Sequence, residues 1–117
     1  MIPKARAISA AKESKLGYDY YHGYGVPQSY AKATYWWKKA AVQGYSISEY
    51  NLGIMYAHGQ GVLQNYVKAV YWHKNAAAQG YAPAENNLVR LLSRTRRTAE
   101  LFQSDILVEK GGGAGEC

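Results

Sequence analysis

The sequence has little of several features that define large classes of protein. It contains one cysteine in 117 residues, so no disulfide can form within the chain and a disulfide-stabilised scaffold is excluded. No apolar run approaches the roughly 18 residues that indicate a membrane-spanning helix. Only eight residues are acidic, and they are scattered without the paired arrangement that general acid–base catalysis uses. We therefore expect neither a membrane span nor an enzyme.

Apolar residues and tyrosine are abundant, at 48% and 12 residues respectively. The length suits one domain, at roughly 100–200 residues per domain, and is sufficient for one hydrophobic core. The net charge is +6, of which residues 1–46 carry +5. Lysine and arginine beside many tyrosines are compatible with single-stranded nucleic acid, which stays an alternative function. However, the tyrosines and tryptophans recur at fixed intervals, and this favours a structural role for them.

That interval is an internal repeat of 36 residues. When residues 16–45 are placed on residues 52–81, 19 of the 30 aligned positions are identical. The identities include Leu16 with Leu52, Gly17 with Gly53, and Trp36 with Trp72. A period between about 20 and 50 residues is typical of proteins built by stacking one small unit.

Each repeat is predicted to fold as two helices. In the second repeat, Leu52 and Tyr56 have helical spacing, and two close glycines, Gly59 and Gly61, then interrupt the helix. A second helix is predicted from Asn65 to Gln79, and the glycine after it ends that helix. Eight residues are expected to form the core: Leu16, Tyr20, Ala33, Trp36, Leu52, Tyr56, Ala69 and Trp72.

With these residues in view, the chain resembles the Sel-one-like repeat family, relatives of the tetratricopeptide repeats. The second repeat carries the family pattern at Leu52, Gly53, Tyr56, Gly59, Gly61, Val62, Lys68, Ala69, Trp72, Ala76, Ala77 and Gly80. The resemblance implies an all-α fold, an α/α solenoid of stacked antiparallel helix pairs, that serves as a scaffold or adaptor for other proteins. It also implies residues 1–108 as one domain, with repeats at about 10–45 and 46–81 and a partial repeat at 82–104.

The ends of the chain depart from the repeat pattern. Leu88, Leu91, Leu92, Thr95, Ala99 and Phe102 form one apolar stripe, which predicts a capping helix from about Pro83 to Ser104. Two alternatives are that the chain is a fragment of a longer array, or that it forms a homo-oligomer through an open end. Residues 109–117 are glycine-rich, end in Cys117 and are expected to be a flexible end.

By similarity to tetratricopeptide arrays, a partner is expected to lie along the hollow face that the first helix of each pair lines. The positions concerned are Ser14, Tyr18, Tyr21, His22, Tyr50, Ile54, Ala57, His58, Asn86, Arg90, Ser93 and Arg94. Arg90 and Arg94 are one helical turn apart and can hold a carboxylate between them. These positions predict a partner protein or an extended peptide with an acidic end. The alternative is that the two arginines belong to a solvated helix face.

The remaining chemistry is predicted to be structural. Gly23-Tyr24-Gly25 and its equivalent at 59–61 lack the strand and the Gly-Lys-Ser/Thr of a phosphate loop. His22 and His58 have no cysteine or carboxylate at metal-ligand spacing, so neither a metal nor a cofactor is expected. His73, which replaces Trp37 of the first repeat, is predicted to lie at the surface. The first residues carry basic charge without an apolar stretch, so a cytoplasmic location is expected, or an exported one if a leader precedes them.

Overall fold

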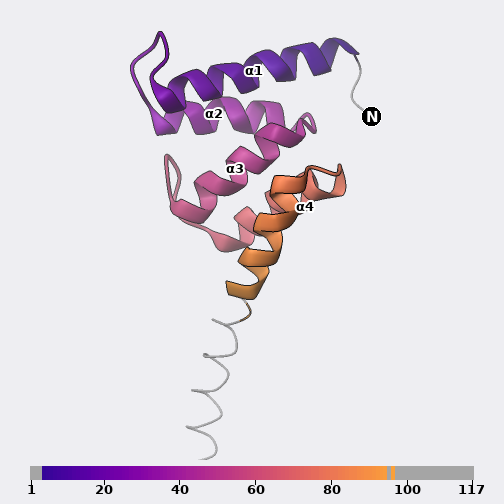
Figure 1. Ribbon diagram of the computed structural model, residues 1–117. Helices are drawn as coiled ribbons and strands as arrows, with labels where there is room; N and C mark the ends of the chain where they lie inside the picture. The colour runs from indigo at the N-terminus through magenta and orange to yellow at the C-terminus, as the bar shows by residue number, and fades with distance from the viewer. Residues whose placement is uncertain (1–3, 95, 97–117) are drawn as a thin grey trace, which may run out of the picture.

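The computed structural model describes residues 4–94 and 96, and this part of the chain is helical without strands. The helices are α1 (Lys4–His22), α2 (Tyr30–Ala41), α3 (Ser46–His58) and α4 (Tyr66–Ala78), followed by helical residues 82–94. Each helix packs against the next, and α1 with α2 and α3 with α4 form antiparallel pairs (Figure 1). The predicted all-α solenoid of helix pairs is confirmed. None of the helices described is long and apolar enough to span a membrane.

The turns within the two repeats share positive-φ glycines, at Gly23 and Gly25 and at Gly59 and Gly61, and a side-chain N-cap, Ser29 or Asn65, before the next helix. Gly59 ends α3 with φ of 67°, and its N–H donates to the carbonyl of Met55. Gly61 also has positive φ, and a Cβ atom there would collide with the Tyr30 carbonyl, so both the conformation and the space require glycine. Asn65 precedes α4 and its side chain accepts a hydrogen bond of 3.0 Å from the backbone N–H of Lys68. The second helix therefore starts one residue after the predicted position, because Asn65 is its N-cap.

The core contains part of the predicted set. Ala33, Leu52, Tyr56 and Ala69 are buried, as expected. Leu16 is 37% exposed, because it lies on α1, and no helix precedes α1 among the described residues to cover it. Its equivalent Leu52 lies between two helix pairs and is fully buried. Tyr20, Trp36 and Trp72 are only half-buried.

The tryptophan that enters the core is Trp37, which is 3% exposed. Its ring lies against Gly17, where a Cβ atom would be 2.9 Å from Trp37 Cγ. The ring N–H donates to the carbonyl of Ser14 at 3.1 Å. Trp36, the preceding residue, is half-buried and contacts the Tyr35 ring edge-on. The family pattern therefore identified the turn of α2 that carries a buried tryptophan, but Trp37 is the buried residue and not Trp36.

His73 is buried, and the prediction that it lies at the surface is wrong. Its exposed fraction is 1%, and it occupies the place of Trp37 in the second repeat. A Cβ atom on Gly53 would be 2.9 Å from His73 Cε1, as the repeat predicts from the contact of Gly17 with Trp37. The burial follows from geometry, since a residue at this helical position faces the first helix of its own pair whatever its polarity.

Two buried carboxylates hold the helix pairs together. Glu13 and Glu49 are 36 residues apart and are 8% and 4% exposed. Gln43 donates to Glu13 at 2.8 Å, and Gln79 donates to Glu49 at 2.6 Å, so each glutamine ties the end of a second helix to its first helix. Burial raises the pKa of Glu49, although the hydrogen bond from Gln79 opposes this change. The acidic residues are therefore not simply scattered, as their sequence positions suggested.

The last described helix covers one side of the second pair. Ala84 is buried, and Leu91 packs on the core cluster that contains Leu52 and Tyr56. Leu92 is 47% exposed, because it lies at the position of Tyr56, where a repeat's own second helix provides the cover. The rest of the predicted capping helix, with Thr95, Ala99 and Phe102, and the glycine-rich end at 109–117 lie outside the described residues.

Candidate partner-binding groove

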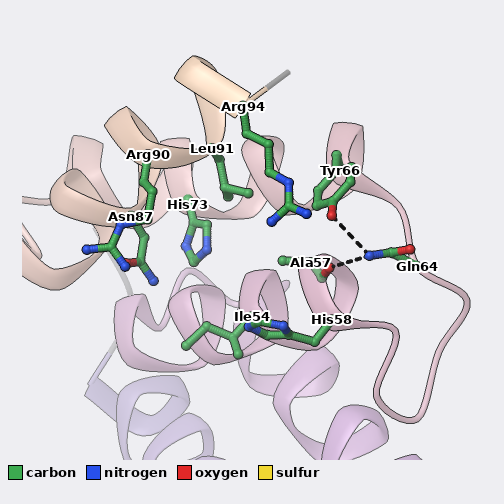
Figure 2. A pocket seen from close by; sticks show the side chains of 10 residues that line it. All are labelled: Ile54, Ala57, His58, Gln64, Tyr66, His73, Asn87, Arg90, Leu91 and Arg94. Carbon is green, nitrogen blue, oxygen red and sulfur yellow. Dashed lines mark hydrogen bonds between the residues drawn. The ribbon is translucent and has the colours of Figure 1, made fainter. Parts of the chain in front are cut away.

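Two neighbouring cavities lie along the first helices of the repeats. The one that we call the second-repeat pocket has a volume of about 390 Å³ and lies between α3, the start of α4 and helical residues 82–94. Figure 2 shows Arg90, Leu91 and Arg94 on one side of it and Ile54, Ala57 and His58 on the other. The ten lining residues are Ile54, Ala57, His58, Gln64, Tyr66, His73, Asn87, Arg90, Leu91 and Arg94.

The other cavity, which we call the first-repeat pocket, has a volume of about 350 Å³. Its lining consists of Tyr18, Tyr21, His22, Trp37, Ile47, Asn51, Ile54, Met55 and Tyr81. Ile54 on α3 lines both cavities, so they are adjacent and α3 separates them. We refer to these two adjacent pockets together as the groove.

The two pockets are equivalent under the 36-residue repeat. Seven residues of the first-repeat pocket have their repeat equivalents in the second-repeat pocket. The pairs are Tyr18 and Ile54, Tyr21 and Ala57, His22 and His58, Trp37 and His73, Asn51 and Asn87, Ile54 and Arg90, and Met55 and Leu91. The repeat therefore builds the same type of site twice and changes its side chains.

The changes make the lining of the second-repeat pocket more polar, while the two pockets have similar volumes of about 390 and 350 Å³. Ala57 and His73 replace the large rings of Tyr21 and Trp37. Arg90 and Arg94 stand where the preceding repeat has Ile54 and His58. Among the described residues that line this pocket none is acidic, and Arg90 and Arg94 contribute positive charge.

His73 forms the buried wall of the second-repeat pocket. Burial lowers its pKa to about 4, so the ring is neutral at pH 7. Its Nδ1 atom is buried without a hydrogen-bond partner among the described residues. The Tyr50 ring lies 5.3 Å away between centroids, and the Tyr50 hydroxyl accepts a hydrogen bond of 3.3 Å from Asn87. On the opposite wall the Arg94 guanidinium lies 5.2 Å from the centre of the Tyr66 ring.

The residues that the sequence proposed for partner binding divide into three groups. Ile54, Ala57, His58, Arg90 and Arg94 line the second-repeat pocket. Tyr18, Tyr21 and His22 line the first-repeat pocket with Ile54. Four others line neither: Ser14 is buried, Tyr50 packs behind His73, and Asn86 and Ser93 are exposed beside the groove. Whether these residues bind a partner stays a prediction.

Of the residues that line the second-repeat pocket, sequence reasoning missed Gln64, Tyr66, His73, Asn87 and Leu91. The first three come from α4 and the turn before it, whereas the predicted positions were confined to first helices. The replacement of Trp37 by His73 at equivalent positions was the available signal, since a smaller ring at a core position leaves space. Across residues 4–94 and 96, no group of three or more histidine, cysteine or acidic side chains is placed to hold a metal ion.

Comparisons with known proteins agree with this repeat structure. The Sel1 repeat family model matches residues 13–45 and 46–81. A Sel1 repeat protein from Oxalobacter formigenes is 39% identical over 70% of this chain, with a TM-score of 0.69. The protective antigen c5321 of uropathogenic Escherichia coli strains, which has an SLR fold, is 45% identical over 61% of the chain, with a TM-score of 0.60. The matched regions span 34% and 15% of those two chains, and no curated protein sequence matches.

Proposed function

The chain belongs to the Sel1 repeat family, and on this premise we propose that it is an adaptor that binds an extended segment of a partner protein along the groove. Members of the family generally act as scaffolds for protein–protein interaction. The observation that carries the proposal is the pair of adjacent, repeat-related pockets that share Ile54. Successive side chains of an extended segment can enter successive pockets of such a groove.

The second-repeat pocket is proposed to receive the anionic end of that segment. Arg90 and Arg94 lie one turn apart on the same helix and line the same pocket, and both side chains are exposed. Guanidinium groups bind carboxylates through two parallel hydrogen bonds.

The proposed function is binding without catalysis. Among the described residues, neither pocket is lined by a serine, threonine or cysteine nucleophile beside its histidine. The groove instead contains tyrosine, tryptophan and arginine, which are the side chains most enriched at the energetic centres of protein interfaces.

Affinity capture from a cell lysate, with the bound proteins identified by mass spectrometry, tests the proposal. The wild type is compared with the charge-reversal pair Arg90→Glu/Arg94→Glu. The control pair Lys38→Glu/Lys74→Glu changes the net charge equally at exposed, repeat-equivalent positions on α2 and α4. A partner that the arginine pair loses and the lysine pair retains, and that then binds directly as a purified protein, supports the adaptor role.

The same experiment distinguishes the adaptor function from the alternative, which is nucleic-acid binding. Nucleic acid bound through total charge would be lost equally with both pairs and would show a steep dependence on salt. If the arginine pair captures the same proteins as the wild type, the proposed role of the second-repeat pocket is wrong.

A further inference from the structure

In the first-repeat pocket, the Tyr21 ring lies among three other rings. Tyr21 lies at the end of α1, with its ring 5.6 Å from that of Trp37, 5.1 Å from Tyr30 and 4.9 Å from His22, measured between centroids. It also packs on the core cluster that contains Met55. The Tyr21 ring therefore has three ring neighbours and one apolar neighbour from the next helix pair.

In the second-repeat pocket, the residues equivalent to these neighbours of Tyr21 are present, but the residue equivalent to Tyr21 itself has no ring. The equivalents of Trp37, Tyr30, His22 and Met55 are His73, Tyr66, His58 and Leu91, and all four line this pocket. The equivalent of Tyr21 is Ala57, whose methyl group lies among them (Figure 2). The space of about 390 Å³ is at the small end of the range for ligand pockets.

We propose that this space receives an aromatic side chain of the partner in the position that Tyr21 occupies in the first repeat. The proposal rests on the adaptor function above and specifies its ligand. The ligand's ring would contact His73, Tyr66 and His58, with Leu91 above it. Ring pairs in tilted or edge-on contact contribute more than their buried area alone, which favours an aromatic over an aliphatic side chain.

Arg90 and Arg94 indicate that the ligand also carries a negative charge. Arg90 and Arg94 enter the same cavity as Ala57 and His73, so a single small ligand group contacts both the ring site and the cationic site. A C-terminal aromatic residue carries a ring and a carboxylate on the same α-carbon. We therefore assign the second-repeat pocket to a partner chain that ends in an aromatic residue, with its α-carboxylate between the two arginines.

The test uses a fluorescein-labelled peptide with a C-terminal phenylalanine, and binding is measured by fluorescence anisotropy. Two altered peptides accompany it, one with a C-terminal alanine and one with an amidated C-terminal phenylalanine. Both are expected to bind about tenfold more weakly or worse, since each lacks one of the two recognised groups. Failure of the phenylalanine peptide to bind the wild type, or equal binding of the alanine peptide, overturns the inference.

Two variants of the protein rebuild the first-repeat arrangement inside the second. Ala57→Tyr supplies the missing ring, and His73→Trp restores the larger wall. Each is expected to abolish binding of the phenylalanine peptide while retaining the helical circular-dichroism signal, because each places additional ring atoms in or beside the position proposed for the ligand's ring. The control Ala11→Tyr adds the same ring at an exposed position on α1 and is expected to bind like the wild type.

The outcomes distinguish this inference from the proposed function. Unchanged peptide binding by folded Ala57→Tyr or folded His73→Trp shows that the ring site is not used, and the inference is then wrong. If a captured partner is lost with Arg90→Glu/Arg94→Glu but retained by Ala57→Tyr, the adaptor function stands and the aromatic assignment fails.

Discussion

The ring of His73 lies directly over Gly53, at a separation where a Cβ atom on residue 53 would be 2.9 Å from both Cε1 and Nδ1 of the ring. The same contact joins Trp37 to Gly17 in the first repeat. A glycine on the first helix thus admits a ring from the second helix in both pairs. This contact sets the packing of each pair, and the ring that the glycine admits also lines the pocket of its repeat.

The substitution Gly53→Leu is expected to destabilise the protein, because the new side chain overlaps the buried His73 ring. Overpacking of this kind typically lowers the free energy of unfolding by about 1–3 kcal/mol. Urea denaturation followed by circular dichroism measures the change. Ala11→Leu, at an exposed position on α1, is the control and is expected to remain near the wild type. A wild-type unfolding midpoint for Gly53→Leu would contradict the packing of these helices.

Stability is expected to decrease as the pH falls, through His73. Its pKa is lowered from 6.5 to about 4 by burial, so the unfolded chain binds a proton at a higher pH than the folded protein does. The stabilising effect of the neutral ring is therefore complete above about pH 6.5 and is lost between that pH and about 4. The loss should amount to no more than about 3 kcal/mol.

The matched variant for that pH dependence is His73→Phe, which retains a buried ring without a titrating group. Its free energy of unfolding should vary less between pH 6.5 and pH 4 than that of the wild type. Glu49 acts in the opposite direction, because burial raises its pKa and its protonation at low pH favours the folded state. The difference between wild type and variant removes this contribution, and parallel pH profiles would contradict the assignment to His73.

Removal of the Gln79 side chain is expected to leave the buried Glu49 carboxylate without its donor. Gln79 Nε2 also donates to the Gly44 carbonyl at 2.9 Å, so one amide joins the second pair to the turn that precedes it. The variant Gln79→Ala should lower the free energy of unfolding by about 1–3 kcal/mol, the desolvation penalty of an unpaired buried polar group. Thermal unfolding measures this change, with the exposed Lys74→Ala as control. Similar midpoints for the two variants would show that the amide is dispensable.

The repeat allowed much of this fold to be predicted, because the 36-residue identity fixes which helix follows which. It did not identify which of the adjacent residues Trp36 and Trp37 is buried, since both are aromatic and the rotation of α2 is set by its contact with Gly17. Nor did it predict the burial of His73, because a polar ring in place of Trp37 is typical of a surface position. Ala57 and His73 distinguish the lining of the second-repeat pocket from that of the first, and only the folded structure brings them into one cavity.

Bidentate binding of a carboxylate by Arg90 and Arg94 can be distinguished from simple attraction by their positive charge. Arg90→Lys/Arg94→Lys retains both positive charges but replaces two planar guanidinium groups by ammonium groups, which cannot bind a carboxylate bidentately. If a carboxylate lies between them, the phenylalanine peptide should bind about tenfold more weakly, a change of about 1.4 kcal/mol. Anisotropy titrations at low and high salt measure it. Wild-type affinity for the lysine pair, together with strong weakening by salt, would mean that the pocket attracts its ligand only by long-range charge, because ammonium groups then serve as well as guanidinium groups.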